Sequence, residues 1–250
     1  MLNNEDFLRY SRNLLLKNFN ENKQLKLKNS TILIVGIGGL GAPVALYLAA
    51  AGVGKMYIAD HDNLDISNLQ RQIVYFTKDI GKKKVFLSKE YLLKVNPNCI
   101  VEPIPYFVDK KIISTIIDKV DLVIDCSDNF KTRSLINNVC VMNNKPLIIG
   151  SAIGLLGQII IIMPPWDCGC YNCIWKVNNN LSNNCDNFGV LGPIVGIIGS
   201  FQALECLKLL TNECSSLKNK IYLFDGNKLN HSILNLQRSS NCNVCGVLYD

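Results

Sequence analysis

The chain has 250 residues, of which 48% are hydrophobic and 18% are charged, a balance typical of a globular α/β protein and not of a disordered chain. We expect one domain over residues 1–250. The net charge of +6 is modest, and no block of lysine and arginine lies beside interleaved aromatic residues, so we expect no nucleic-acid partner.

The N-terminal segment and two apolar stretches bear on where the protein works. The first residues include acidic side chains and no continuous apolar run, so we expect no secretion signal and a cytoplasmic protein. The stretch 147–163 is interrupted by glycines and predicts two buried strands around a turn. The stretch 194–210 carries Gln202, Glu205 and Lys208 on one helical face, which predicts an amphipathic core helix. We therefore expect no membrane partner.

Hydrophobic periodicity predicts a short amphipathic helix over 5–18 and then a regular alternation of strands and helices up to residue 150. In chain order, the predicted elements are strand 31–35, helix 42–53, strand 55–60, helix 81–95, strand 99–105, helix 110–118, strand 121–125, helix 130–144 and strand 145–150. Such alternation is typical of βαβ units, so we expect an α/β fold with a Rossmann-like, doubly wound, mainly parallel sheet that binds ligands at the carboxyl ends of its strands.

The second part of the chain breaks this rhythm. Segments 158–163 and 220–226 predict strands that extend the same sheet in antiparallel fashion, and a long helix is predicted from about residue 193. No linker or internal repeat separates the two parts. We expect a nucleotide-binding half over 31–150 and a second half over 151–250.

A glycine-rich turn, GIGGLG at 36–41, follows the first predicted strand at once and opens a helix. In this context Gly36 permits the tight turn, Gly38 lets the backbone approach a phosphate, and Gly41 lets the helix pack on the strand. Asp60 ends the next strand, where an acid would hold a ribose hydroxyl. This fingerprint alone indicates a dinucleotide such as NAD.

The segment SNLQRQ, which starts at Ser67, favours a different ligand. Asn68 and Arg71 follow the ribose acid closely, and Lys84 comes after them. These groups suit a polyphosphate better than a nicotinamide. Lys84 belongs to a lysine triplet, so Lys82 or Lys83 are alternatives for the same role, and all three are compatible with a solvated helix face.

Two C-x-x-C pairs, Cys170–Cys173 and Cys242–Cys245, have the spacing of metal ligands. Four thiolates suit a tetrahedral structural zinc site without an open position, which would clamp two distant segments together. The alternatives are a redox-active pair or simple burial. Eleven cysteines in a chain without a secretion signal argue against a disulfide framework.

The segment DCSDN ends another predicted strand and contains Asp125, Asp128 and Asn129. One interpretation is a plain strand end followed by an Asx turn. The other is a carboxylate at the nucleotide crevice that holds Mg²⁺ on phosphates.

Taken together, these motifs resemble the ubiquitin-activating-like adenylyltransferases of the ThiF, MoeB and HesA family. The resemblance covers nearly the whole chain, since RYSRN, GIGGLG, SNLQRQ, DCSDN, CYNC, NNCDNFGVLGP, FQALECLKLL and CNVC stand in the family's order. Within the family, the segments DFLRYSRNLLL at 6–16 and PPWDCGCYNCIW at 164–175 are most similar to the ThiF type.

The resemblance implies ATP-dependent adenylation of the C-terminal glycine carboxylate of a small ubiquitin-like sulfur carrier, ThiS, which prepares its thiocarboxylate for thiazole synthesis in thiamine formation. It implies the cofactors ATP, Mg²⁺ and Zn²⁺, a carrier-binding role for 151–250, and a homodimer. A sulfur donor protein is a further possible partner. The nucleotide-binding residues carried over by motif are Gly36, Gly38, Gly39, Gly41, Asp60, Ser67, Asn68, Arg71, Lys84, Asp128 and Asn129.

The resemblance also implies catalytic roles for Arg12, Arg71, Asp128 and Cys185. Arg71 would reach the phosphates, and Asp128 would serve Mg²⁺ and the adenylate. Arg12 matches an arginine that the family supplies from the neighbouring subunit. Cys185 matches the thiol that links to the activated carrier; an ordinary loop cysteine is the alternative.

Three other functions stay open at this point. A MoeB-type enzyme would perform the same chemistry on the molybdopterin sulfur carrier. A catalytically inactive binding module would keep the fold and lose the ATP chemistry. An NAD oxidoreductase would bind NADH and not ATP. The simultaneous presence of Arg12, Asp60, Arg71, Lys84 and Asp128 speaks against an inactive module.

Overall fold

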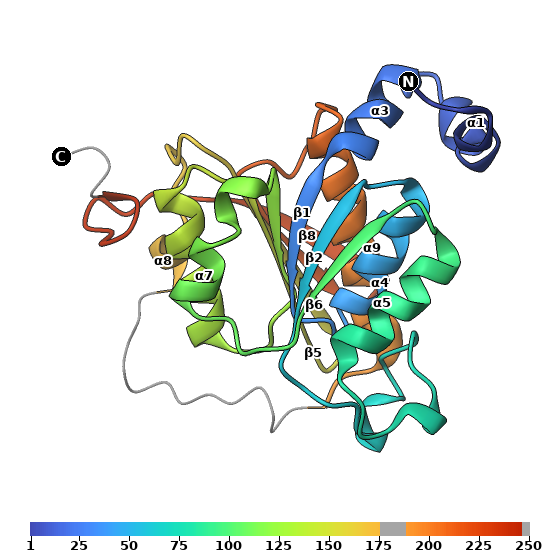
Figure 1. Cartoon of the computed structure of the whole chain (residues 1–250). Coiled ribbons are helices and arrows are strands. Elements are labelled where there is room, and N and C mark those ends of the chain that lie inside the picture. The colour runs from blue at the N-terminus through green and yellow to red at the C-terminus, as the bar shows by residue number, and fades with distance from the viewer. Residues whose placement is uncertain (176–188, 247–250) are drawn as a thin grey trace.

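A computed structural model describes residues 1–175 and 189–246, and its centre is one eight-stranded sheet (Figure 1). The strand order is β3-β2-β1-β4-β5-β6-β7-β8. The strands are β1 (Thr31–Val35), β2 (Lys55–Ala59), β3 (Ile100–Ile104), β4 (Leu122–Asp125), β5 (Leu147–Ile153), β6 (Leu156–Ile162), β7 (Lys220–Asp225) and β8 (Asn230–Asn235). The first five pair in parallel, and the last three continue the sheet in antiparallel fashion. Both features confirm the predicted fold.

Helices cover both faces of this sheet (Figure 1). On one face lie α4 (Gly41–Ala51), α5 (Lys84–Val95) and α9 (Gly192–Leu210); on the other lie α6 (Lys110–Ser114), α7 (Phe130–Met142) and α8 (Tyr171–Ile174). The central strands are apolar on both sides because both sides are covered. In β1, for example, Ile32 and Ile34 pack toward α4, whereas Leu33 and Val35 pack into the cluster that contains α7.

The chain order of the strands creates a crevice beside β1. From β1 the chain builds outward to β2 and β3, then returns to add β4 and β5 on the other side. At such a reversal the loops that leave two neighbouring strands turn to opposite faces, so a crevice opens at their carboxyl ends. The loops that follow β1 and β4 both begin at this crevice.

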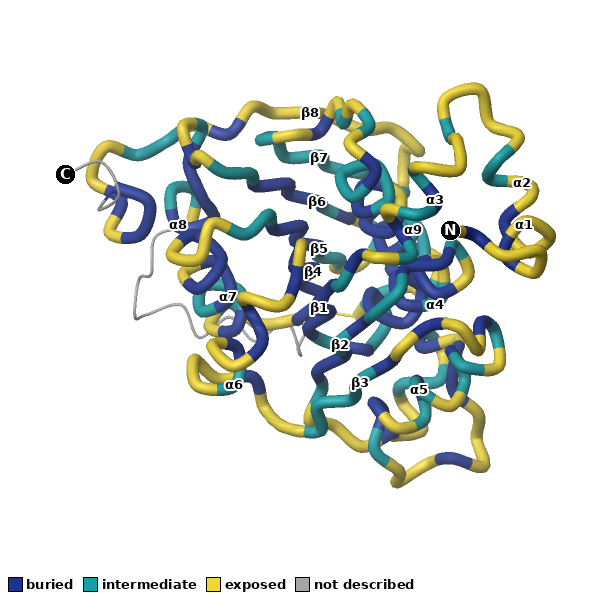
Figure 2. Tube along the Cα trace, turned by 45° about the horizontal axis from the view of Figure 1, so that its top comes forward, coloured by how far each residue is buried: buried dark blue, intermediate teal, exposed yellow. Residues whose placement is uncertain are grey.

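The N-terminal region and the last strand differ from the prediction. The helix predicted over 5–18 is two short helices, α1 (Asn4–Arg9) and α2 (Ser11–Leu14), and the pattern missed α3 (Glu21–Asn29) and β8. Helix α3 is largely polar and buries only Gln24 and Leu27, so it has no apolar period to detect. Every residue of β8 is exposed, because β8 forms the edge of the sheet (Figure 2). Three single turns of 3₁₀ helix complete the structure: η1 (Ile66–Asn68), η2 (Thr77–Asp79) and η3 (Ile117–Lys119).

Helix α9 is the one described helix whose length and hydropathy would suffice to cross a membrane. In the structure it packs on the sheet and on α4. The expectation of a solvent-facing polar side is wrong for Gln202 and Glu205, which are buried with partners. Gln202 donates a hydrogen bond to the Asp125 carbonyl (3.0 Å), and Glu205 accepts one from Lys208 (2.6 Å). The buried amide of Gln202 therefore ties α9 to the end of β4.

We predict opposite effects for two helical glycines. A Cβ at Gly41 would lie 1.9 Å from the Gly36 carbonyl oxygen, so Gly41→Ala should destabilise the fold by about 3 kcal/mol or more. A Cβ at Gly196, in α9, would meet nothing within 4 Å, so Gly196→Ala should be neutral or stabilising by up to about 1 kcal/mol. Denaturant unfolding of both variants measures the difference; equal stabilities would contradict the close approach at Gly41.

Candidate active site

A cleft of about 1010 Å³ opens at the carboxyl ends of the parallel strands, where the topology predicts a ligand site. Its walls come from segments that are far apart in the sequence: the glycine turn, residues 60–62, residues 68–72, Lys84 and the loop after β4. It continues past β5 to β7 and β8. The cleft is thus large enough for a nucleotide together with an extended segment of a second molecule.

The glycine turn brings the loop after β1 against the loop after β4. Gly36 has φ +85°, and a Cβ there would lie 2.8 Å from the Cys126 carbonyl oxygen. Gly36, Gly38 and Gly39 all line the cleft, while Gly41 lies behind them as the first residue of α4. The amino end of α4 therefore faces the cleft, where its free N–H groups favour an anion.

Asp60 is held in place by backbone donors. Its carboxylate accepts hydrogen bonds from the N–H of Ile37 (2.9 Å) and of Asp62 (2.8 Å). Burial raises the pKa of Asp60, although these two bonds and the charge of Lys84 oppose the shift. The carboxylate thus spans the glycine turn and the end of β2, in position to accept from a ribose hydroxyl.

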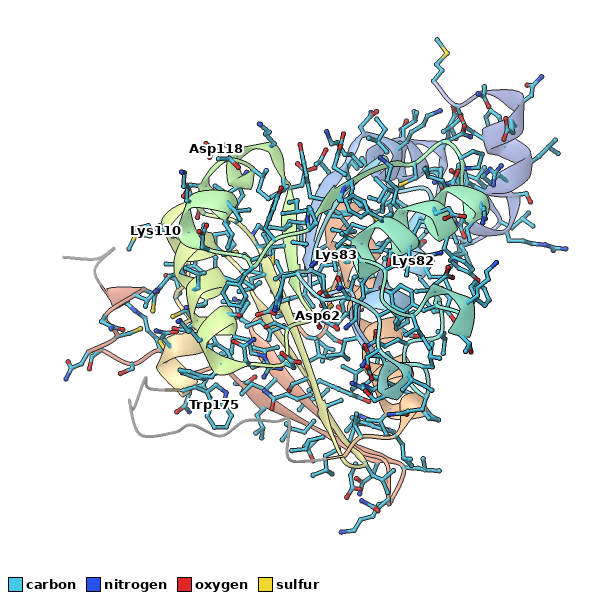
Figure 3. All side chains as sticks on the ribbon, turned by 60° about the horizontal axis from the view of Figure 1, so that its bottom comes forward. Asp62, Lys82, Lys83, Lys110, Asp118 and Trp175 are labelled. Carbon is cyan, nitrogen blue, oxygen red and sulfur yellow. The ribbon has the colours of Figure 1, made fainter. Side chains whose placement is uncertain are left out.

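The structure distinguishes the three consecutive lysines. Lys84 is buried, lines the cleft and forms an ion pair with Asp62 at 2.9 Å. The other two, labelled in Figure 3, are engaged elsewhere: Lys82 with Asp79 (2.8 Å) and Lys83 with the His61 carbonyl. Lys84 is therefore the member of the triplet that is positioned to meet a phosphate.

Asp62 is a site residue that the sequence analysis missed. Its backbone carbonyl accepts from the Lys84 N–H (3.2 Å), and the Leu64 N–H donates to the Lys82 carbonyl (2.8 Å). This short backbone pairing places the Asp62 carboxylate beside the Lys84 ammonium. Asp62 follows Asp60, the predicted ribose acid, by two residues, so the D-x-D spacing was the available signal.

Asn68, the last residue of η1, and Arg71, which follows η1, both line the cleft. The Arg71 guanidinium donates to the Ser67 carbonyl (2.9 Å), which leaves further N–H donors for an anion. Ser67 itself does not line the cleft; its hydroxyl donates to Asp65 (2.7 Å).

The loop after β4 supplies carboxylates at two depths. Asp128 and Asn129 line the cleft and are exposed, and the Asn129 side chain caps α7 by accepting from the Thr132 N–H (2.9 Å). Asp125 lies fully buried beneath them, and burial raises the pKa of its carboxyl group. One of its oxygens accepts from the Ser127 N–H (2.8 Å), and the other has no partner among the described residues.

Arg133, another residue that the sequence analysis missed, fixes the shape of this loop. It lines the cleft and donates to the Ser127 carbonyl (2.7 Å). Its buried Nε, the Ser127 hydroxyl and the Thr132 hydroxyl have no hydrogen-bond partner among the described atoms. The Asp128 carboxylate, with the Asp125 carboxylate and two unpaired hydroxyls beneath it, is a set of oxygen atoms that fits a hard cation such as Mg²⁺ and its water ligands.

The four cysteines of the C-x-x-C pairs come together as predicted, on the face of the sheet that carries α7. Their sulfur atoms all lie within 4.8 Å of one another, with Cys170–Cys242 at 3.7 Å and Cys173–Cys245 at 3.4 Å. Zn–S bonds of about 2.3 Å in a tetrahedron place sulfur atoms about 3.8 Å apart, so the cluster has the size of a zinc site.

One predicted catalytic residue, Arg12, is not among the residues that line the cleft. Arg12 is exposed on α2, whereas the cleft lies at the carboxyl ends of the parallel strands. Cys185 lies outside the described residues.

Comparison with known proteins agrees with this geometry. The family model described as "ThiF family" matches residues 10–244, almost the whole chain. The chain belongs to the ThiF family. Two relatives of the chain are named adenylyltransferases, whose reaction uses ATP and not NAD.

A sulfur carrier protein ThiS adenylyltransferase from Escherichia coli is 43% identical over 245 residues, which cover 98% of this chain and 97% of that protein. The adenylyltransferase and sulfurtransferase MOCS3 from Drosophila virilis is 40% identical, but the chain spans only 55% of its length. Among solved structures, E. coli MccB with ATP has a TM-score of 0.81 at 28% identity, covering 95% of this chain and 73% of MccB. MccB with MccA-N7isoASN has a TM-score of 0.83 at 28% identity, covering 98% and 76%.

We predict that Lys84→Ala weakens binding of ATP·Mg²⁺ by about 2 kcal/mol, or roughly 30-fold, because it removes a charge-assisted hydrogen bond in a buried position. Lys82→Ala is the matched control, since it removes the same charge two residues away outside the cleft, and should change the affinity less than twofold. Titration calorimetry on both variants checks this. A comparable loss in both would mean that general surface charge and not Lys84 attracts the nucleotide.

Proposed function

We propose that this protein uses ATP to adenylate the C-terminal glycine carboxylate of a small ubiquitin-like sulfur carrier of the ThiS type, preparing its thiocarboxylate for thiamine thiazole synthesis. The observation that supports the proposal is that Arg71, Lys84 and Asp128 line one cleft with the glycine turn and with Asp60, whose carboxylate accepts from the Ile37 N–H. The 43% identical E. coli relative supports the carrier assignment.

In this reaction the carrier's carboxylate attacks the α-phosphate of ATP. A carboxyl–phosphate bond forms, the bond between the α- and β-phosphates breaks, and pyrophosphate leaves. The protein contributes positioning and charge neutralisation, since both reactants are anions. Asp60 orients the ribose, Arg71, Lys84 and Asn68 bind the phosphates, and Asp128 would hold Mg²⁺, which neutralises further phosphate charge.

The second candidate function is the same reaction on a molybdopterin-type sulfur carrier, as in MoeB. The 40% identical MOCS3 relative supports this second candidate, although the chain matches only part of that protein. The chemistry is shared, so the carrier alone distinguishes the two.

Cysteines in the second half of the chain have two further proposed roles. Cys170, Cys173, Cys242 and Cys245 would hold one structural Zn²⁺, since four thiolates leave no open position. After adenylation, Cys185 would become linked through sulfur to the activated C-terminus of the carrier, with release of AMP from the adenylate. A sulfur donor protein would act after this step. Free thiols in this number fit the cytoplasm, which keeps them reduced. We assign the nucleotide to 31–150 and zinc and the carrier to 151–250 of one domain.

We propose a homodimer in which Arg12 of each subunit completes the partner's cleft. Two sets of large apolar side chains are exposed in the single chain, on α1–α2 and on the segment from η1 to α5. They are Phe7, Leu8, Leu15, Leu16, Ile66, Ile73, Phe76, Ile80 and Phe86. Exposed apolar groups of this extent favour a protein interface, and Arg12 stands within the first set.

Pyrophosphate exchange tests the proposed function. Exchange of labelled pyrophosphate into ATP should require a ThiS-type carrier with a free C-terminal glycine, and Asp128→Ala should reduce it by about 100-fold or more because Mg²⁺ loses a ligand. Asp118→Ala, an exposed carboxylate beyond the amino end of β4, is the control and should retain full exchange. Exchange with a molybdopterin-type carrier alone would establish the second candidate, and unchanged exchange in Asp128→Ala would refute the site.

Subunit mixing tests the homodimer. Arg12→Ala and Asp128→Ala should each be nearly inactive, because an arginine supplied in trans contributes about 10³-fold or more to phosphoryl-type transfer. A mixed dimer has one site with both defects and one with neither, so mixing should restore about half of the wild-type rate per heterodimer. If subunits exchange without recovery, Arg12 acts in its own subunit or not at all.

A further inference from the structure

One face of α7 packs against the turn that carries the first cysteine pair. Phe130, Ser134 and Asn137 have the spacing of one helical face. The Phe130 and Tyr171 rings lie 5.8 Å apart, and the Ser134 hydroxyl donates to the Asn172 side-chain oxygen at 3.2 Å. The residues that follow Cys170 are therefore docked along the first half of α7.

Asn137 makes the closest link to the cysteine cluster. It is fully buried, and its side-chain oxygen accepts from the Tyr171 N–H at 3.0 Å. Since that N–H requires an acceptor, the orientation of the amide is fixed, and its NH₂ group faces Cys170 Sγ (3.5 Å) and the Asn172 oxygen (3.3 Å). An N–H donor to a metal-bound thiolate orients the ligand and stabilises its charge.

The amino end of α7 belongs to the nucleotide cleft. Asn129 caps the helix and lines the cleft beside Asp128. Arg133, in the first turn of the helix, donates a hydrogen bond to the Ser127 carbonyl. Asn129 and Asn137 are eight residues apart, or about 12 Å along a rigid helix. The same helix thus holds the Mg²⁺-binding loop at one end of this face and the cysteine cluster at the other.

We propose that zinc binding and nucleotide binding are coupled through α7, with Asn137 as the positioning residue between them. A zinc ion bound to Cys170 holds the turn from Tyr171 to Asn172 in place. Because this turn packs on α7, it also holds the face of α7 next to the Asp128 loop in place. The coupling rests on the proposed ATP and zinc sites. Because coupling between two binding equilibria is reciprocal, a bound nucleotide must also tighten zinc binding.

This reciprocity allows a test on the zinc-loaded, folded enzyme. Zinc affinity is measured at free zinc fixed by a chelator buffer, with and without saturating ATP·Mg²⁺ and without carrier, so that no ATP is consumed. In the wild type, ATP should raise zinc affinity by about fivefold or more. The readout is metal content, not activity.

Asn137→Asp is the decisive variant. It keeps an acceptor for the Tyr171 N–H but replaces the donor to Cys170 with a carboxylate, so zinc affinity should fall by about 10- to 100-fold and the effect of ATP should fall below about twofold. Asn138→Asp makes the same change on the next, exposed residue and should behave as wild type. Ser134→Ala, which removes one bond to Asn172, gives a second, milder test and should reduce the effect of ATP partly.

Calorimetry on the same samples separates the possible failures. If the wild type does not bind ATP, the proposed function and the coupling that rests on it are both wrong. If it binds ATP and zinc affinity does not change, or if Asn137→Asp and wild type respond equally to ATP, the coupling through α7 is wrong.

Discussion

The site depends on one close approach, that of the backbone after β1 to the backbone after β4. The Cys126 N–H donates to the Val35 carbonyl at 2.8 Å, and the chain then turns at Gly36, where a Cβ would stand 2.8 Å from the Cys126 carbonyl oxygen. Gly41 lets α4 begin directly behind this turn. Any side chain at either glycine would separate the anion-binding turn from the carboxylates of the β4 loop, and the two halves of the cleft would no longer face one ligand.

The charged side chains of the cleft suit a negatively charged substrate. Lys84 is buried and is neutralised by Asp62, and the Asp60 carboxylate is satisfied by two backbone N–H groups. Burial raises the pKa values of Asp60 and Asp125, because a charged carboxylate is less stable in a poorly solvated environment. A phosphate that enters the cleft gains the Lys84 ammonium, and such interactions are stronger in a desolvated site than in water.

The sequence was sufficient for features that depend on local patterns. Strand and helix alternation from 31 to 150, the glycine turn and the two cysteine pairs each have a period or spacing that requires no tertiary information. Asp62 and Asn137 were missed because each acts through a partner from a distant segment, and Arg133 was missed because it acts through the Ser127 carbonyl, a backbone atom that no side-chain pattern marks. Helix α3 and strand β8 bury too little apolar surface to produce a pattern. Arg12 is predicted from resemblance alone, and a single chain does not bring it to the cleft.

The transfer of label from ATP to the carrier is the most direct test of the central claim, that the cleft directs a carboxylate to the α-phosphate. The enzyme is incubated with a ThiS-type carrier and ATP labelled at either the α- or the γ-phosphate, and carrier is isolated by rapid quenching. The account predicts that label from the α-phosphate appears on the carrier and that label from the γ-phosphate appears only in pyrophosphate. Transfer of γ-label to the carrier, or binding of ATP without transfer of either label, would contradict it.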